Sequence, residues 1–216
     1  MASKIQIKRG LSANRTSIVP ASGELLFTTD DKSVYVGDGS TAGGVPVGRQ
    51  QYELISTATV SGASTVDFTN LSSAYSQYLV VVTNMGVNRS GGSFVGIRVS
   101  HNNGVTFETT SYNFTTLVTS SAPSVDGGGS TSGSEIGLAL IYEQAPAYSN
   151  IAFSITGAGV AAATTIDGYG ATSNASVRFN GRRNVTTAVN AVRIFSASTS
   201  PAATFSGTFR LYGIKA

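Results

Sequence analysis

The sequence contains no cysteine and no tryptophan, and its only histidine is His101. Without cysteine, the chain cannot form a disulfide, a zinc ribbon or a thiol active site. A single histidine also excludes metal sites that need two imidazole ligands. A serine–histidine–acid triad would have to use His101, and no G-x-S-x-G motif accompanies it. We therefore expect no cofactor, no metal site and no enzymatic activity.

Charge is also scarce, because charged residues make up 12% of the chain, about half of the ~25% found in typical soluble proteins. The net charge of +3 is spread along the sequence, whereas nucleic-acid binding needs a clustered basic face. No run approaches the ~18 apolar residues of a membrane span, and the first ten residues lack the apolar core of a secretion signal. We expect folding in the cytoplasm, no nucleic-acid binding and no membrane insertion.

Small polar residues dominate instead. The chain has 30 serines, 25 threonines and 25 glycines among 216 residues, with 41% hydrophobic residues. The apolar fraction is sufficient for a core, and the hydroxyl-rich and glycine-rich remainder is typical of strands separated by many turns. This composition predicts an all-β protein.

The first 49 residues hold 10 of the 25 charges and end in the turn-forming segment Thr41–Gly48. We place a domain boundary there. Alternation over Lys4–Lys8 predicts a strand with Ile5 and Ile7 facing inward. The segments Glu24–Thr29 and Val34–Val36 predict a β-hairpin.

So small a module buries little apolar surface alone. Its consecutive Leu25, Leu26 and Phe27 place apolar groups on both faces of one strand. We expect the module to self-associate or to dock on a larger assembly; packing against the rest of the chain is the alternative.

Residues 50–216 read as short strands separated by glycine, serine and asparagine. Asn103-Gly104 predicts a hairpin whose return strand begins at Val105. Ala122–Ser134 reads as a flexible glycine-rich loop. The pattern predicts a jelly-roll-like antiparallel β-sandwich. The expected strands are 52–60, 65–69, 77–83, 92–100, 105–107, 112–120, 136–142, 151–156, 176–180, 191–196 and 208–214.

Three separated motifs carry a resemblance. A basic strand ending in Arg-Gly over Lys4–Gly10, a Gly-Glu hairpin over Pro20–Leu26 and a closing Gly-Asp-Gly-Ser over Tyr35–Thr41 resemble the N-terminal module of phage hyaluronidase-like and tropism-determinant-like fibre proteins. The ending Ser206–Lys215 is similar to a β-rich domain of phage virion proteins, although Tyr52 stands where that domain often has tryptophan. The two resemblances imply a virion structural protein that forms a homotrimer.

Two sets of candidate residues follow. Residues expected to trimerise or to attach the module to the virion are Ile5, Ile7, Arg9, Leu25, Leu26, Phe27 and Tyr35. Residues expected to bind a receptor are His101, Asn102, Asn103, Tyr169, Arg182 and Arg183. We interpret His101 as an exposed turn residue, Tyr169 as a loop residue, and Asn180–Asn184 as a hairpin tip or the site of an inter-subunit salt bridge.

The predicted function is a short trimeric tail fibre that binds a host receptor. The expected partners are further copies of the chain, other phage virion proteins and a host surface glycan or protein; the expected location is the virion. A capsid decoration (cement) protein is the alternative, and a glycan depolymerase is a third hypothesis. A depolymerase needs two carboxylates ~5–10 Å apart, and no short-range pair exists among the acidic residues after the boundary. Those residues are Glu53, Asp67, Glu108, Asp126, Glu135, Glu143 and Asp167.

Overall fold

The computed structural model describes residues 7–48, 52–88, 93–120, 125–141, 149–172, 175–197 and 203–214. The chain divides into two compact units, Met1–Gln50 and Gln51–Ala216. Strands dominate both units, and the helix of the described residues is the single turn α1 (Ser12–Arg15). The all-β prediction is confirmed.

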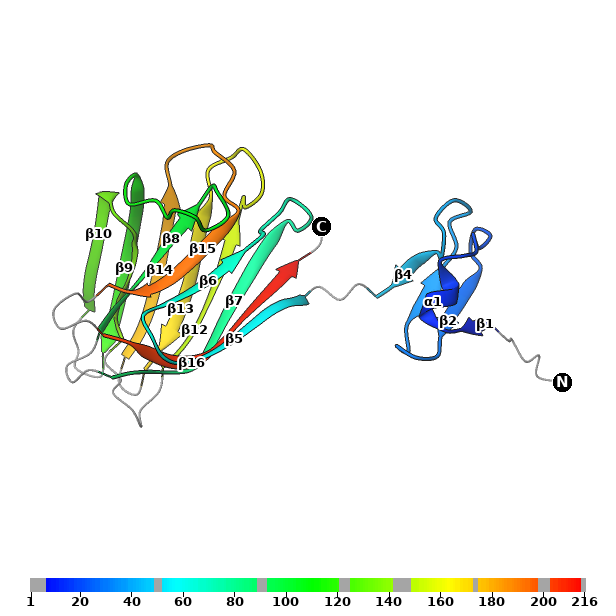
Figure 1. Ribbon diagram of the computed structural model, residues 1–216, viewed down its shortest axis with the longest axis horizontal. Helices are drawn as coiled ribbons and strands as arrows, with labels where there is room; N and C mark the ends of the chain where they lie inside the picture. Colours follow the sequence, from blue (N-terminus) through cyan, green and yellow to red (C-terminus); the bar gives the residue numbers. More distant parts are fainter. Residues whose placement is uncertain are drawn as a thin grey trace. The chain divides into compact units, whose positions relative to one another are not determined.

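The first unit is a four-stranded sheet in the order β1, β2, β3, β4 (Figure 1). The predicted hairpin is formed by β2 (Leu25–Thr28) and β3 (Val34–Val36), which pair antiparallel. The edge strand β1 (Lys8–Gly10) runs parallel to β2. Of the expected strand over Lys4–Lys8, Lys8 lies in β1 and Ile7 lies outside the strand; residues 4–6 lie outside the described residues.

The segment interpreted as turns also contains a strand, β4 (Val45–Val47), which pairs with β3. Proline is tolerated at a sheet edge because one side of an edge strand needs no N–H donor. Pro46 therefore does not prevent pairing here.

Carboxylates close the turns of this unit. The Asp38 carboxylate accepts hydrogen bonds from the Thr41 hydroxyl at 2.5 Å, the Thr41 N–H at 2.7 Å and the Ser40 N–H at 2.9 Å. These donors hold the pKa of Asp38 far below its usual range. In the β2–β3 turn, a hydrogen bond from the Thr28 hydroxyl lowers the pKa of Asp31.

Side chains also tie separate segments of the unit together. The Lys8 ammonium lies 2.5 Å from the Glu24 carboxylate, which also accepts the Ala21 N–H at 3.0 Å. The Lys8 contact is the main reason that the pKa of Glu24 is lowered. Arg15 of α1 donates to the Gly43 carbonyl at 2.8 Å. Hydrogen bonds and an ion pair therefore connect the segments of this small unit.

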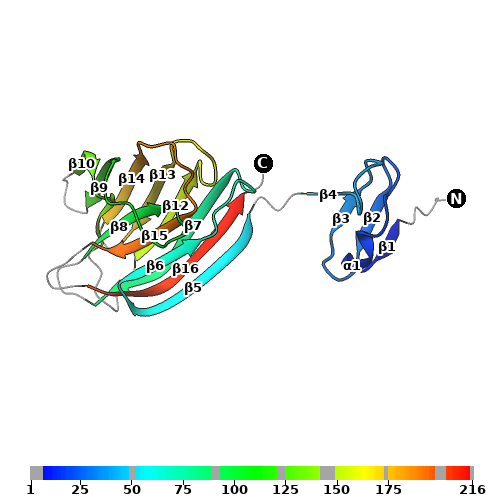
Figure 2. The same ribbon diagram turned by 45° about the horizontal axis from the view of Figure 1, so that its top comes forward.

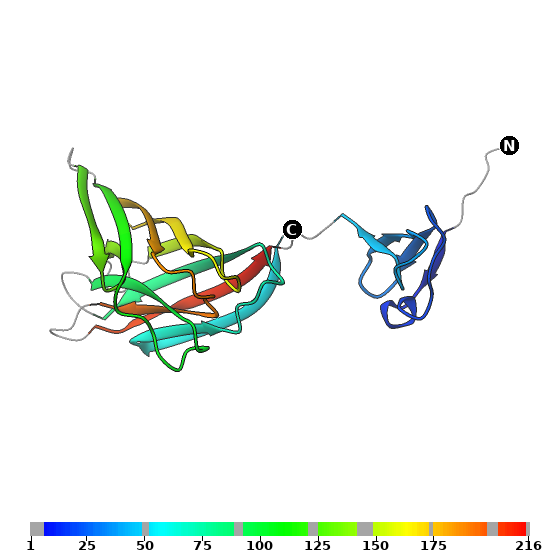
Figure 3. The same cartoon turned by 90° about the horizontal axis from the view of Figure 1, so that it is seen from above.

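The second unit is a β-sandwich, as predicted. One sheet has eight strands in the order β10-β9-β14-β13-β12-β7-β16-β5, and the other has four in the order β11-β8-β15-β6. The smaller sheet crosses in front of the larger one in Figure 1, and Figure 3 shows β9 and β10 at the opposite end of the large sheet from β16 and β5. The strands of the large sheet are β5 (Glu53–Ala63), β7 (Gln77–Val87), β9 (Tyr112–Ser120), β10 (Val125–Gly133), β12 (Ser149–Thr156), β13 (Thr165–Ala171), β14 (Ala175–Arg183) and β16 (Phe205–Ile214). Those of the small sheet are β6 (Thr65–Thr69), β8 (Ser93–Ser100), β11 (Ile136–Ile141) and β15 (Ala191–Ser196).

Alternation along the strands builds the core between the sheets. In β12, Ile151, Phe153 and Ile155 are buried while the residues between them are partly exposed. In β16, Phe205 and Phe209 are almost fully buried. A period of two places every second side chain on the same face of a sheet. The opposite face of the large sheet is therefore left for polar residues.

The glycine-rich segment over Ala122–Ser134 is not a loop within the described residues. Residues 125–133 form the edge strand β10, which pairs antiparallel with β9. Pairing with a neighbouring strand overrides the weak intrinsic preference of glycine for strands. The prediction of flexibility for this segment is wrong there; residues 121–124 lie outside the described part.

The predicted hairpin at Asn103-Gly104 is also wrong. Both residues take positive φ values, 58° and 88°, as a turn requires. However, β8 before the turn belongs to the four-stranded sheet and β9 after it belongs to the eight-stranded sheet. The segment crosses between the sheets, and the expected return strand 105–107 is absent from this described stretch.

Two further corrections concern β13 and β14. Tyr169 lies on a strand, β13, and not on a loop. Asn180–Arg183 continues β14 and is not a hairpin tip. The glycines beside Tyr169 suggested a loop, but glycine also occurs inside strands where the backbone is closely packed. A Cβ on Gly168 would lie 2.5 Å from the Cβ of Phe153.

Candidate functional site: the outer groove of the large sheet

The outward-facing side of four neighbouring strands, β10, β9, β14 and β13 (Figure 2), carries an open groove of about 760 Å³. We call it the outer groove. Its outward-facing side chains are Thr115, Leu117, Asp167, Tyr169, Arg178 and Asn180, with Gly127 and Gly129 on the edge strand.

The strand register arranges these residues in two rows across the sheet. In the first row Tyr169 lies opposite Arg178, Arg178 opposite Leu117, and Leu117 opposite Gly127. In the second row Asp167, Asn180, Thr115 and Gly129 lie opposite one another in the same way. With strands about 4.8 Å apart, each row extends roughly 14 Å.

The first row carries two apolar side chains that are exposed to solvent. The Tyr169 ring is 65% exposed and Leu117 is 44% exposed. On β10, Gly127 and Gly129 contribute only backbone, so that end of the groove has a flat floor. The groove thus offers an aromatic surface at one end and open backbone at the other.

The polar groups of the groove are only partly engaged. The Asp167 carboxylate accepts a hydrogen bond from the Ser154 hydroxyl at 2.9 Å. Arg178 is exposed, and its guanidinium donates no hydrogen bond to any residue that the structure describes. Its five N–H donors are therefore available to a ligand.

This composition suits binding. The groove lining contains one carboxylate, Asp167, whereas general acid–base cleavage of a glycosidic bond uses two. Three other carboxylates of the sandwich contact arginine: Asp67 lies 2.7 Å from Arg193, and Glu135 lies 3.0 Å from Arg98. The third, Glu108, lies 3.1 Å from Arg183.

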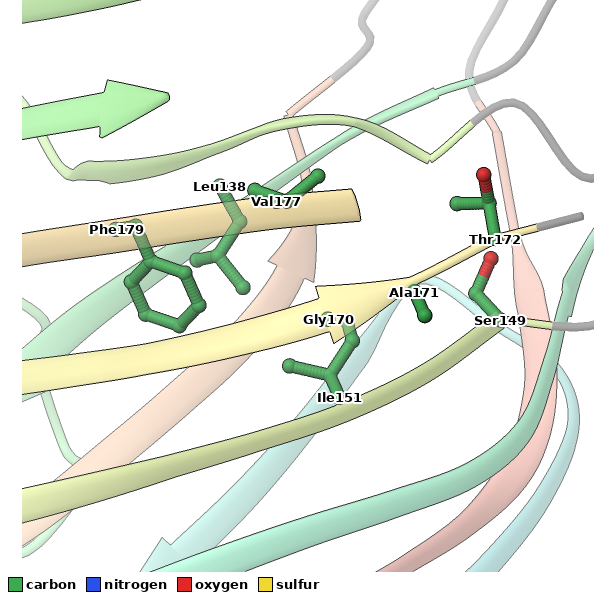
Figure 4. A pocket seen from close by; sticks show the side chains of 8 residues that line it. All are labelled: Leu138, Ser149, Ile151, Gly170, Ala171, Thr172, Val177 and Phe179. Carbon is green, nitrogen blue, oxygen red and sulfur yellow. The ribbon is translucent and has the colours of Figure 1, made fainter. Parts of the chain in front are cut away.

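A second recess lies inside the sandwich, at one end of β12, β13 and β14. Leu138, Ile151 and Phe179 point into it (Figure 4), and its volume is about 10 Å³. A cavity needs at least ~10–15 Å³ to hold one water molecule. This recess is a packing gap and not a ligand site.

The structure separates the predicted receptor residues into three places. Tyr169 lines the outer groove. Arg182 lies on β14 beyond Asn180 and on the same exposed face, where its Nε donates to the Asn184 side chain at 2.6 Å. The polar residues of the groove were missed, although the alternation of Arg178, Asn180 and Arg182 with apolar residues along β14 was a usable signal.

Arg183 and His101 lie in an ionic cluster away from the groove. Arg183 occupies the inward-facing phase of β14 and is only 8% exposed. Its guanidinium lies 3.1 Å from Glu108, and the His101 Nε2 lies 3.6 Å from the same carboxylate. His101 is thus half-buried, and its Nδ1 is 3.0 Å from the Ala188 carbonyl. The interpretation of His101 as an exposed turn residue is wrong.

The same cluster includes Tyr112, whose hydroxyl accepts the Val99 N–H at 2.9 Å. Burial raises the pKa of Tyr112 to about 12. This phenol therefore remains protonated at neutral pH.

Asn102 and Asn103 hold the crossing between the sheets. The Asn102 side chain accepts the Thr106 N–H at 2.9 Å and donates to the Thr106 hydroxyl at 2.8 Å. The Asn103 side chain accepts the Asn70 N–H at 2.7 Å and donates to the Asn70 side chain at 2.9 Å. The Asn103 hydrogen bonds join two loops, whereas those of Asn102 stabilise the turn within one.

The predicted attachment residues of the first unit are less uniform than the sequence suggested. Leu26 is buried, Phe27, Tyr35 and Ile7 are half-buried, Leu25 and Arg9 are exposed, and Ile5 lies outside the described residues. The Tyr35 ring is covered by the Arg15 guanidinium at 3.8 Å. The apolar side chains that the unit exposes are Leu11, Ile18, Val19, Leu25 and Val47.

Comparison with known proteins bears on the first unit. Residues 5–41 match the family model described as the major tropism determinant N-terminal domain. The first unit is similar to that domain. The resemblance expected from the three sequence motifs is confirmed.

This family match does not extend into the sandwich. No curated protein matches the chain. Solved structures of the major tropism determinant P3c, U1 and M1 variants align at 17%, 17% and 16% identity, each with a TM-score of 0.20. They cover 80%, 74% and 74% of this chain, which spans 42%, 40% and 40% of their lengths. At this TM-score the alignments say nothing about the sandwich. The described residues contain no helix with the length and apolar character of a membrane span.

Proposed function

We propose that this chain is a bacteriophage virion protein of the tail-fibre type, whose sandwich attaches the particle to the host cell surface. The observation that carries the proposal is the joining of a tropism-determinant-like first unit to a separate sandwich with a wide, open groove. The unengaged Arg178 and the exposed Tyr169 give that groove the chemistry of a binding site.

The first unit serves assembly in this proposal. Leu26 is the only hydrophobic residue of its described part that is buried, while Leu11, Val19 and Val47 are each more than half exposed. Apolar surface of this kind is stabilised by contact with other protein surfaces. We propose that these side chains meet those of two further copies in a homotrimer, and that the unit also contacts other virion proteins.

Trimerisation would matter for attachment because it presents three outer grooves together. Linked sites bind a multivalent surface far more tightly than one site alone, by about 10²–10⁴-fold when geometry allows joint engagement. A weak individual groove is then sufficient for attachment.

The experiment uses the full-length chain, with sedimentation for its oligomeric state and labelled protein for binding to intact host cells. We expect a trimer that binds cells, and at least tenfold weaker binding after Tyr169→Ala. Tyr52→Ala is the matched control because Tyr52 is also an exposed tyrosine, at 51%, and lies outside the groove.

Two results would overturn the proposal. One is a protein that coats isolated capsids and does not bind cells, which is the behaviour of a cement protein. The other is release of reducing ends from host glycans, which is the behaviour of a depolymerase. A monomer that still binds cells would overturn only the assembly role of the first unit and would leave attachment standing.

A further inference from the structure

We propose that the outer groove binds an acidic oligosaccharide, with a sugar ring stacked on Tyr169 and the sugar carboxylate paired with Arg178. The inference rests on the proposed function, because it identifies the host-surface ligand as a glycan.

The position of the groove argues against an extended peptide. Strands β9, β14 and β13 each have paired neighbours on both sides, so their backbone groups are already hydrogen-bonded. A peptide that adds to a sheet needs a free strand edge, and among the four strands of the groove only β10, at its rim, has one. A ligand lying over the face of these strands must be recognised by side chains.

Tyr169 supplies an apolar surface suited to a sugar. Its neighbours across the sheet are Arg178 on β14 and Ala152 on β12. The small Ala152 side chain leaves that flank of the ring open. An aromatic face packs against the C–H face of a pyranose while the sugar hydroxyls remain at its edges.

Arg178 supplies the charge recognition. A guanidinium binds a carboxylate through two parallel N–H donors, and Arg178 has no described partner that competes for them. Directly opposed side chains in an antiparallel pair have Cβ atoms about 4.5–5.5 Å apart. One sugar residue can therefore contact the Tyr169 ring and place its carboxylate on Arg178.

The second row supports the neighbouring sugar. Asp167, Asn180 and Thr115 lie two residues away along their strands, or roughly 6.6 Å at ~3.3 Å per residue. The Asp167 carboxylate accepts hydrogen bonds from sugar hydroxyls, whereas the Asn180 amide and the Thr115 hydroxyl both donate and accept. With a single carboxylate in the lining, the bound glycan is held and not cleaved.

Gly127 provides a sharp test of the groove. A Cβ at this position would have its nearest neighbour at 3.6 Å, an ordinary contact, and the glycine has no positive φ. The fold therefore accepts Gly127→Val, and the added side chain projects beside Leu117 into the groove. This variant should weaken binding of a glycan long enough to reach β10, without loss of stability.

The experiment measures binding of the full-length chain to galacturonate, glucuronate-containing and sialylated oligosaccharides, each beside its methyl-esterified, uncharged counterpart. We expect at least one acid to bind, and its ester to bind at least tenfold more weakly. Arg178→Gln should weaken binding of that acid at least tenfold. Gly127→Val should weaken binding of acid and ester alike.

Arg182→Gln is the matched control, because Arg182 lies on the same face of β14 but outside the groove lining. We expect a change of less than twofold. All variants should have the same melting temperature as the wild-type protein, which would show that the fold is intact.

The outcomes separate this inference from the function on which it rests. Cell binding without binding to any oligosaccharide, or cell binding lost on protease treatment of the cells, overturns the glycan and leaves attachment standing. Equal binding of acid and ester overturns the role of Arg178. Absence of cell binding overturns attachment itself.

Discussion

The two units of this protein are stabilised in different ways. Among described residues the sandwich buries 29 hydrophobic side chains, whereas the first unit buries one, Leu26. The first unit instead relies on carboxylates that accept several hydrogen bonds, with Asp38 as the clearest case. Small domains bury too little surface to be stable on their apolar core alone.

This difference in stabilisation fits the separate roles that we propose for the two units, binding for the sandwich and assembly for the first unit. The sandwich has a complete core, so the outer face of its large sheet is free to carry a binding groove. The first unit leaves apolar side chains exposed, so it gains stability from assembly. Each unit can therefore be perturbed separately, and hydrogen exchange followed by mass spectrometry can report on both in one full-length chain.

The largest expected effect is in the sandwich core. Phe209 is fully buried and its ring lies 5.4 Å from that of Phe205. Phe209→Ala should lower the free energy of unfolding of the sandwich by about 3–5 kcal/mol. Chemical denaturation measures the loss, and exchange in the first unit should not change. Val105→Ala, at an 81% exposed site, is the control and should cost less than about 0.5 kcal/mol.

The next effect tests the first unit. A Cβ on Gly37 would lie 2.0 Å from the Ala21 carbonyl oxygen, so backbone must move. Gly37→Ala should destabilise this unit by about 1–3 kcal/mol through overpacking, seen as faster amide exchange in residues 7–48 alone. Gly10→Ala, where nothing lies within 4 Å, should behave as wild type. Faster exchange throughout the sandwich would contradict the independence of the units.

Acid should also affect the first unit. The pKa values of Glu24, Asp31 and Asp38 are lowered by their hydrogen bonds in the folded state. A carboxylate whose pKa is lower in the folded state contributes stability that is fully present above its unfolded pKa of about 4, and this contribution is lost progressively as the pH falls toward the folded pKa. Exchange in the first unit, corrected for intrinsic rates, should rise between about pH 5 and 3. Asp38→Asn should reduce that dependence, and an unchanged profile would contradict the assignment.

The smallest effect concerns an ion pair at the sandwich surface. Arg193 contacts both oxygens of Asp67 at 2.7 Å and lies 4.0 Å over the Phe107 ring. The hydrogen bonds that Arg193 donates to Asp67 raise the pKa of Arg193. Because the pair is partly exposed, Asp67→Asn should cost only about 0.2–1 kcal/mol in denaturation experiments. A loss of unfolding free energy as large as that of Phe209→Ala would contradict this prediction, because it would mean that the pair contributes as much as a core residue.

Local pattern predicted the fold class, the sandwich and the Leu25–Val36 hairpin, because alternation and turn residues act over a few positions. The role of β10 was missed because its pairing depends on the free edge of β9, which no local signal reveals. Asn103-Gly104 made the expected turn, but the next strand, β9, pairs with β14 and β10 in the other sheet, and these partners are distant in sequence or missed by local pattern.

The candidate site was harder to predict for the same reason. Tyr169 was identified by its residue type, but its neighbours come from β14, β9 and β10, which the strand order of the folded sheet brings beside it. Arg183 follows Arg182 in sequence and was grouped with it, yet the period of two sends the two side chains to opposite faces.

The bare backbone at Gly127 has an evolutionary consequence. A single codon change there adds a side chain to the ligand surface and requires no compensating change in the interior. Natural variants of this protein with altered host range should therefore differ at Gly127 of β10 more often than at Gly168 of β13, where a Cβ would lie 2.5 Å from the Phe153 Cβ and 2.7 Å from the Phe179 ring.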